Sequence, residues 1–231
     1  MRVLKLRLYQ DLVCYRKPMS FKAGETYPLP PPSTINGFLH NALGAKEYIP
    51  MTFSIQGTYT SITNNLQRLY KFGSVRKDKG KIRNYWAVIG NTAINPGVYY
   101  ANLLVEVSLI IHVKASEDVL MQLSEVLLFP REYLSLGRRE DIVRIDEVSL
   151  VSLQEREDRR NGIPLRYPAY VPKQYALDND LHGINYRLNS YYEIKGGFKK
   201  WEQVEMLYVE SGKVYSKVFV DEQGDLVFWH K

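Results

Sequence analysis

The excess positive charge of this chain is concentrated in one segment, residues 60–100, where it could hold a polyanion. The 231-residue chain has a formal net charge of +6, and this segment alone contains seven Lys or Arg residues against one acid, Asp78. Aromatic residues are interleaved with these cations. Because cations attract phosphates and aromatic rings stack on bases, the mixture favours single-stranded nucleic acid, with a solvated basic loop as the alternative. The candidate RNA-binding residues here are Arg76, Lys77, Lys79, Lys81, Arg83, Tyr85 and Trp86.

A second group of candidates lies in the segment Tyr133–Asp141, where a glycine precedes two arginines. Backbone N–H groups next to a glycine, together with two guanidinium groups, can contact phosphate oxygens. The alternative is an ordinary helix-to-strand turn with a solvent-facing arginine pair. An isolated lysine in an earlier loop could flank the same RNA or simply be solvated. These candidates are Lys22, Ser135, Gly137, Arg138 and Arg139.

Metal-free RNA cleavage would need a base, an acid and a cation near the phosphate. His112 and Lys114 fall on the same side of a predicted strand, because side chains alternate along a strand, and Tyr27 could supply a phenol. We interpret His112 as an edge-strand residue without a catalytic role. The sequence contains no zinc-type Cys/His cluster and no acidic metal cluster, so neither metal nor cofactor is expected.

The elements that must position these residues follow from hydrophobic periodicity. Strands are predicted at 2–9, 52–60, 103–113 and 146–153, with helices at about 33–43 and 117–128. Gly44 should end the first helix, and Gly37 inside it predicts close packing against its backbone. The order β-α-β-β-α-β is the ferredoxin-like pattern also used by RNA-recognition modules, with the basic segment inserted between the second and third strands.

Residues 154–231 are predicted to be a small β-rich C-terminal part of this α+β protein. They comprise a charged linker, a Tyr- and Pro-rich stretch at 167–175 and a meander from Val204 onward. The composition, 45% hydrophobic and 24% charged, is that of a globular protein rather than a disordered chain. A single cysteine, Cys14, and the lack of a membrane-length apolar run lead us to expect a cytoplasmic protein without membrane contact.

Two motifs carry a resemblance to a known family. The segment Tyr27–Leu39 (YPLPPPSTINGFL) resembles the signature of the CRISPR-associated protein five family, within the RAMP superfamily. Tyr133–Asp141 (YLSLGRRED) resembles that family's loop after the second helix, and the basic segment resembles its thumb. The resemblance covers residues 1–153, which it identifies as a RAMP-type domain with a basic arm at 60–100. The C-terminal part fits the family only as a variable second part, and its length and sequence resemble the type I-B or a related branch.

The resemblance implies a non-catalytic RNA-binding subunit of a type I Cascade surveillance complex that acts in antiviral defence. Such a subunit holds and caps the 5′ handle of the crRNA, next to the backbone subunit and the large subunit. Target DNA is reached only through the complex, because guide pairing reads its sequence. The basic arm should be mobile when free, and should become ordered once crRNA lies between it and the first backbone subunit.

Two alternatives remain open. In type I-C systems one branch of the family is an endoribonuclease that processes precursor crRNA with a Tyr, Lys and His set. The corresponding residues here would be Tyr27, Lys114 and His112, but Lys and His are adjacent in that branch, whereas Val113 separates them here. The other alternative is a single-strand RNA-binding protein that works alone.

Overall fold

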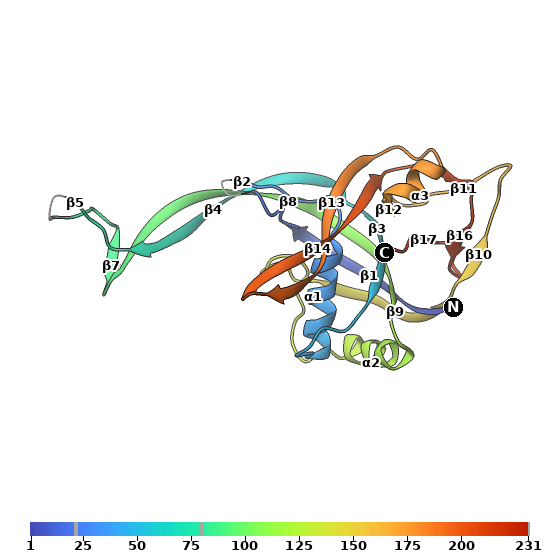
Figure 1. Ribbon diagram of the computed structural model, residues 1–231, viewed down its shortest axis with the longest axis horizontal. Coiled ribbons are helices and arrows are strands. Elements are labelled where there is room, and N and C mark those ends of the chain that lie inside the picture. Colours follow the sequence, from blue (N-terminus) through green and yellow to red (C-terminus); the bar gives the residue numbers. More distant parts are fainter. Residues whose placement is uncertain (21–22, 79–80, 231) are drawn as a thin grey trace.

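A ten-stranded sheet forms the centre of the molecule (Figure 1). The structure is a computed structural model that describes residues 1–20, 23–78 and 81–230, without the side chains of 77, 78, 81 and 82. The main path of the sheet runs β13-β14-β12-β3-β8-β1-β9, and β2, β4 and β7 also pair with β8. These strands are β1 (Arg2–Val13), β2 (Ala23–Gly24), β3 (Thr52–Thr58), β4 (Ser61–Ser74), β7 (Ala87–Ile89), β8 (Thr92–Lys114), β9 (Arg144–Ser152), β12 (Ala169–Pro172), β13 (Ile184–Lys195) and β14 (Phe198–Val209).

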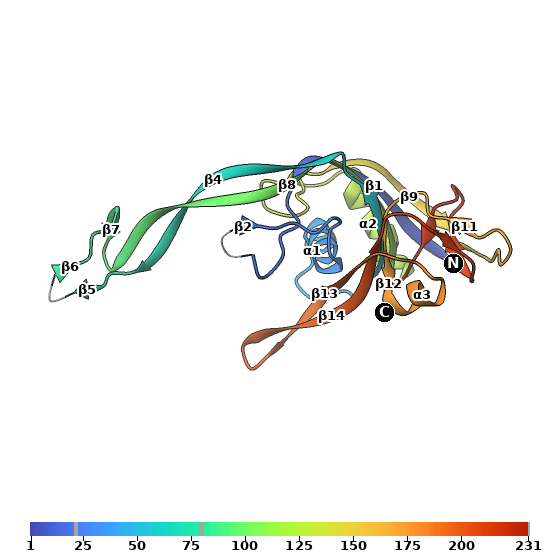
Figure 2. The same ribbon diagram turned by 90° about the horizontal axis from the view of Figure 1, so that it is seen from above.

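Two β-ribbons extend from this sheet on the same side of the molecule, and in Figure 2 helix α1 (Pro32–Leu43) lies between them. The first ribbon is formed by β4 and β8, which pair without interruption from Ser61↔Val105 to Ser74↔Thr92. At its tip, β5 (Lys77–Asp78) pairs with β6 (Lys81–Ile82). The second ribbon is formed by β13 and β14, which are joined by two glycines with positive φ, Gly196 and Gly197.

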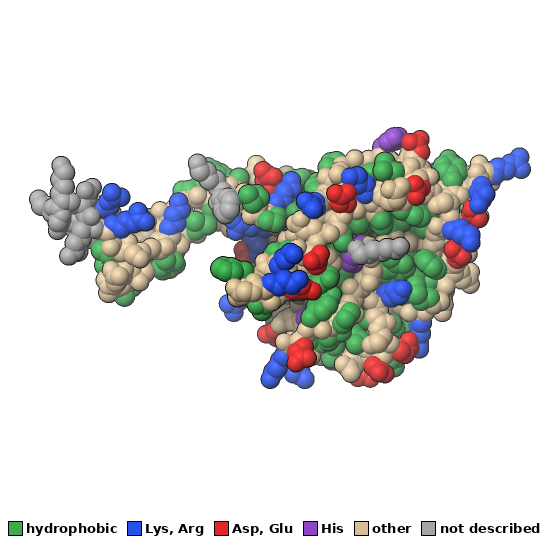
Figure 3. All heavy atoms as spheres, in the orientation of Figure 1, with side chains coloured by type: hydrophobic (Ala, Val, Ile, Leu, Met, Phe, Trp, Pro, Cys, Tyr) green, Lys and Arg blue, Asp and Glu red, His purple; other side chains and the backbone are tan. Residues whose placement is uncertain are grey.

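The stem of the basic segment is a paired β-ribbon rather than a loop, whereas the mobility expected for the free arm stays a prediction. Residues 61–74 and 92–105 form a regular antiparallel ladder, in which each strand satisfies the backbone groups of the other. The glycine- and asparagine-rich composition suggested a loop, but pairing along the whole stem overrides the weak strand propensity of those residues. Figure 3 shows Lys and Arg side chains along this ribbon.

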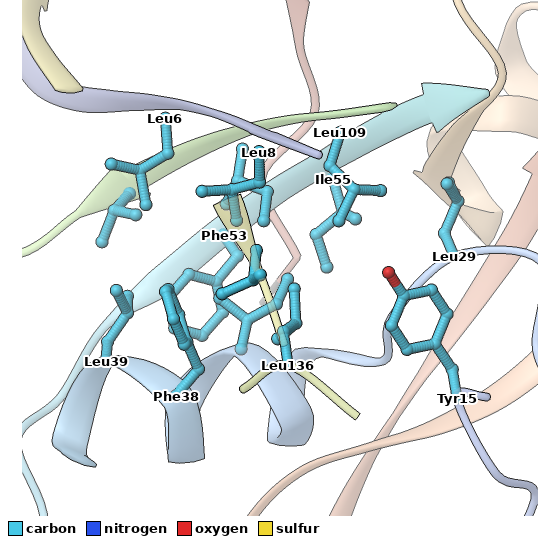
Figure 4. Packing of buried hydrophobic residues seen from close by; sticks show 14 of the residues in the cluster. Leu6, Leu8, Tyr15, Leu29, Phe38, Leu39, Phe53, Ile55, Leu109 and Leu136 are labelled. Atoms are coloured by element: carbon cyan, nitrogen blue, oxygen red, sulfur yellow. The ribbon is translucent and has the colours of Figure 1, made fainter. Parts of the chain in front are cut away.

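Helices α1 and α2 (Glu117–Leu128) cover one face of the sheet. The alternation in β1 points Leu6 and Leu8 toward the helices, where they meet Phe38 and Leu39 of α1 (Figure 4). Burying such a side chain contributes about 1.5–3 kcal/mol, so this layer is a main source of stability. Helix α1 ends as predicted at Gly44, whose φ of 64° closes the helix in the left-handed region.

The C-terminal region covers the opposite face of the sheet. Strand β12 pairs with β3 and β14, so residues beyond 154 extend the same sheet. The last segment crosses the sheet, where the Phe228 amide donates to Ser54 Oγ and the Gln56 amide donates to the Leu226 carbonyl. The remaining elements are β10 (Gln154–Arg156), β11 (Ile163–Pro164), α3 (Lys173–Asp178), β15 (Lys213–Val214), β16 (Val218–Val220) and β17 (Leu226–Val227).

Candidate nucleic-acid interface

The first ribbon has two different faces. On one face, Leu69 packs against a small buried cluster that contains Cys14 and Tyr99. Residues that are paired across the two strands lie on the same face of the ribbon. The residues of β4 on either side of Leu69, and their partners in β8, therefore lie together on the opposite face. Large apolar side chains on that face are between 44% and 70% exposed: Leu66, Tyr70, Phe72, Val98 and Tyr100. An exposed apolar stripe of this size is typical of an interaction surface.

The cations of the ribbon lie on both faces. Arg68 is exposed on the aromatic face, and Lys71 is exposed on the other. Arg76 is exposed at the start of the tip, and its carbonyl accepts a hydrogen bond from the amide of Arg83. Lys77 and Lys81 lie in the tip hairpin, but their side chains are outside the described atoms. Lys22 and Lys79 fall outside the described residues.

The two aromatic candidates at the tip have different positions. Tyr85 is half-buried, and its phenol oxygen accepts a hydrogen bond from the Arg76 amide at 2.8 Å, so it holds the tip backbone. Trp86 is 63% exposed and lies 5.6 Å from the Tyr70 ring, centroid to centroid. Trp86 and Tyr70 therefore extend the exposed aromatic face toward the tip, where a base can stack.

The segment 134–143 is a tight loop organised by Asp141, which is 2% exposed. One Asp141 oxygen accepts hydrogen bonds from the amides of Cys14 (3.1 Å) and Arg138 (2.9 Å). Gly137 has φ of 119°, and a Cβ there would lie 2.9 Å from the same carboxylate. The loop thus requires glycine at this position, because both the backbone conformation and the space exclude a side chain.

The two arginines of this loop have different roles. The Arg138 guanidinium is bound to Asp141 through Nε (3.0 Å) and Nη2 (2.7 Å), and its side chain is only 17% exposed. Its Nη1 also lies 3.4 Å from Gln67 Oε1 of β4, so the loop and the base of the first ribbon are adjacent. Arg139 is exposed, and among the described residues its side chain has no hydrogen-bond or ion-pair partner. Ser135 is half-buried and bridges to Ile142 through the backbone.

This difference predicts that the two arginines respond separately to alanine substitution. Arg138→Ala should lower the free energy of unfolding by about 1–3 kcal/mol, because Asp141 loses charge-assisted hydrogen bonds. Arg139→Ala should leave stability unchanged and weaken RNA binding, since only this guanidinium is free to contact phosphate. Urea unfolding and RNA filter binding on both variants measure the two effects. The assignment is wrong if Arg139→Ala binds RNA as the wild type does.

The structure does not bring Tyr27, His112 and Lys114 together. His112 is fully buried on the sheet face opposite the helices, with Nε2 3.1 Å from Asp221 Oδ2. Tyr27 belongs to the core on the helix side, edge-on to Tyr186 at 5.5 Å. Lys114 is exposed at the end of β8. His112 is thus an interior residue of a central strand rather than the edge-strand residue expected, because β3 and β1 pair on either side of it.

The buried histidines predict a pH-dependent stability. Burial lowers the pKa of His112 below 6.5, although the hydrogen bond with Asp221 acts in the opposite direction, and burial also lowers the pKa of His230. The unfolded histidines take up protons as the pH falls below about 6.5, whereas the folded ones stay neutral. Stability should therefore be complete above that pH and decline toward pH 5, which urea unfolding across this range would measure. His230→Gln should reduce the decline, and His182→Gln, whose side chain is 88% exposed, should not.

Three features of the site were not found in the sequence. Asp141 stabilises the loop through its hydrogen bonds. Its spacing of three residues from Arg138 is the sequence feature that could have indicated their ion pair. Lys17 lies about 6 Å from the rings of Tyr27 and Tyr186, a contact between distant segments that leaves no local pattern. The second ribbon adds aromatic side chains beside α1, among them Tyr191 and Trp201.

Within residues 1–20, 23–78 and 81–230, no cluster of three or more His, Cys, Asp or Glu side chains is arranged to hold a metal ion. The same residues include no helix with the length and apolarity needed to cross a membrane.

The fold and this site define an α+β protein with a basic, aromatic ribbon beside a helix-covered sheet. The family CRISPR-associated protein (Cas_Cas5) matches residues 3–189, and the chain belongs to this family. Among curated proteins, none matches the sequence significantly.

Solved structures give two comparisons. A chain of a "CRISPR RNA-guided surveillance complex" is 14% identical, with a TM-score of 0.55 over 96% of this chain and 92% of its own. This likeness shows that the two chains share a fold. A "CRISPR protein from Archaeoglobus fulgidus" is 12% identical, with a TM-score of 0.47 over 100% of this chain and 99% of its own.

Proposed function

We propose that this protein is a non-catalytic crRNA-binding subunit of a type I CRISPR Cascade complex, where it holds and caps the 5′ handle of the crRNA. One observation carries the proposal: the first ribbon combines the net positive charge of the chain with an exposed aromatic face. Phosphates and bases of a single strand are the ligands that this combination fits. Membership of the Cas5 family supports the assignment to a CRISPR complex.

Within this proposal, residues 1–153 are a ferredoxin-like domain of the RAMP type. The strand order β3-β8-β1-β9, with each neighbouring pair antiparallel, supports the assignment, as do the two helices on one face. The first ribbon is then an insertion between the second and third strands. RNA-recognition modules use a related scaffold to bind single-stranded RNA.

The partners follow from the same proposal. The protein would contact a backbone subunit and the large subunit in the cytoplasm, and would meet target DNA only through the assembled complex, whose guide reads the sequence. The subtype proposed from the C-terminal region is type I-B or a related branch. Precursor cleavage is the competing function, and no observation favours it, since Tyr27, His112 and Lys114 lie in separate environments.

Incubating the pure protein with precursor crRNA in EDTA tests the proposal. We expect a stable complex with handle-containing RNA and no cleavage product. Co-expression with the backbone and large subunits should then yield a complex that contains this protein. Cleavage by the pure protein would contradict the non-catalytic assignment. RNA binding without co-purification of either subunit would instead identify a protein that works alone.

A further inference from the structure

A cavity of about 420 Å³ lies between α1, the segment 45–48 and the second ribbon. This volume is within the range of small-ligand sites, roughly 300–1,000 Å³. Its lining combines the rings of His40, Tyr48, Tyr191, Tyr192 and Trp201 with residues of α1 that include Asn36 and Gly37. We propose that this cavity receives one unstacked base of the bound single-stranded RNA, an inference that rests on the function proposed above and names the contact that reads the base.

The aromatic walls form an open stack. The ring of Tyr48 stacks on His40 at 5.7 Å with an interplanar angle of 10°, and on Tyr191 at 5.1 Å with an angle of 24°. Tyr48 is 47% exposed, and Trp201 lines the same cavity 5.1 Å from Tyr192. Because every base has a π-face, a series of rings that is open to solvent is suited to accept one more planar ring.

A β-bulge in the second ribbon directs these rings into the cavity. The register of β13 against β14 shifts between Asn189 and Tyr191, which leaves Ser190 as an extra residue. In a regular strand successive side chains point to opposite faces, yet Ser190, Tyr191 and Tyr192 all line the cavity. Bulges that redirect side chains are frequent next to functional sites.

Gly37 is among the residues that line the cavity, and its surroundings contradict the close packing expected from the sequence. A Cβ added at Gly37 would have no heavy atom within 4 Å. Glycine in a helix interior lowers helix stability relative to alanine, and no neighbour in the described residues accounts for it here. A ligand that approaches the backbone of α1 would account for this glycine.

Asn36, next to Gly37, is 7% exposed and lines the cavity, and its Oδ1 has no hydrogen-bond partner in the described structure. Buried hydrogen-bond acceptors nearly always have a donor, so we expect a bound ligand to donate a hydrogen bond to this oxygen. The exocyclic amino group of a base supplies one after a small rotation of the amide. Adenine is the best match, because an asparagine amide can pair with its N6 and N7 together.

Cations near the cavity could hold the flanking phosphates. Lys46 lines the cavity, and Lys199 lies 4.1 Å from the centroid of the Tyr192 ring. Helix α1 lies between the two ribbons (Figure 2), and the cavity lies between α1 and the second ribbon. The proposal therefore requires an RNA strand that extends from the first ribbon past α1 to the second ribbon.

Eight-nucleotide single-stranded RNAs with one abasic position, moved along the sequence, test the proposal on the full chain. In the wild type, one abasic position should reduce affinity about 5- to 160-fold, the range that corresponds to the loss of one base–aromatic stacking contact. Gly37→Leu places a side chain in open space inside the cavity. This variant should bind intact RNA with the same reduced affinity and should no longer respond to that abasic position.

Further variants separate the roles within the cavity. Tyr191→Ala should repeat the effect of Gly37→Leu, and Tyr215→Ala, an exposed tyrosine on another part of the surface, should bind RNA as the wild type does. Replacing an adenosine at the sensitive position with purine riboside, which lacks the N6 amino group, should weaken binding to the wild type but not to Asn36→Leu.

The outcomes distinguish the two proposals. If Gly37→Leu and Tyr191→Ala remain folded by thermal unfolding and bind RNA with wild-type affinity, the cavity receives no base, while the RNA-binding function stands. If the wild type binds none of these RNAs, both proposals fail. Equal sensitivity to an abasic site at every position would also overturn the inference, because it would indicate uniform stacking along the ribbon rather than one captured base.

Discussion

Replacement of Asp221 by alanine is expected to lower the free energy of unfolding by about 3–5 kcal/mol, the usual cost of removing one partner of a buried ion pair. Asp221 Oδ2 is bonded to the Lys5 ammonium and to His112 Nε2, and neither side chain is exposed. Asp221 Oδ1 accepts hydrogen bonds from the amides of Gln223 (3.0 Å) and Asp225 (2.8 Å). One carboxylate thus joins the central strands to the C-terminal turn.

The charge state of Asp221 agrees with this role. Burial alone would raise the pKa of its carboxyl, but the hydrogen bonds from His112, Lys5 and the Asp225 amide, together with the charge of Lys5, hold the pKa well below the ordinary value. The carboxylate therefore stays ionised at every pH at which the protein is expected to work. Without it, the partners of Lys5 among the described residues are Asp225 (2.7 Å) and Gln223 (2.8 Å).

Urea unfolding of Asp221→Ala against Asp146→Ala measures this effect. Asp146 forms an ion pair with Arg144 in which both side chains are largely exposed, so its loss should change stability only slightly. Lys5→Met combined with Asp221→Leu removes both charges and should be less destabilised than Asp221→Ala. The buried ammonium is removed together with its carboxylate, and Asp225, which also loses Lys5, keeps its ion pairs with Arg7 (3.3 Å) and Arg166 (3.9 Å). Equal destabilisation by Asp221→Ala and Asp146→Ala would contradict the proposed importance of this network.

The parts of the fold that sequence predicts well are those with a strong local period. Helix 117–128 has the predicted bounds, because a regular apolar stripe with Leu120, Leu123 and Leu127 lies between Ser116 and Pro130. The second ribbon was missed except for its last residues. Its strands are mostly exposed, and the polar residues of 184–203 show no alternation that could reveal a buried face.

The sequence predicted those parts of the candidate site whose residues lie close together along the chain. The concentration of cations in 60–100 is a property of the sequence itself, and it predicted the first ribbon as an RNA-binding element, which stays a prediction. The pairing of Arg138 with Asp141 could not be separated from a phosphate-binding arrangement without coordinates. The contacts of Lys5 with Asp221 and of α1 with β13 join residues more than a hundred positions apart, which no short motif encodes.

Removal of the tip of the first ribbon is expected to cause the largest loss of RNA affinity. Residues 75–91 contain five of the seven cations of the basic segment together with Trp86. Ser74 and Thr92 are paired across the ladder, so an Asn-Gly turn can replace the tip and leave the stem intact. The log–log dependence of affinity on salt should flatten by about 0.7 for each phosphate of a single strand that the tip no longer neutralises.

Trp86→Ala separates stacking from charge in the same tip. This variant should lose about 1–3 kcal/mol of binding free energy, the usual contribution of one stacked base, while its salt slope stays that of the wild type. Phe129→Ala provides the control, because Phe129 is also exposed, at 86%, but lies at the end of α2. RNA titrations between about 50 and 500 mM salt, over which the Debye length falls roughly threefold, give both quantities. If the Asn-Gly variant folds and keeps the affinity and slope of the wild type, the tip is a solvated loop and the phosphates are held elsewhere.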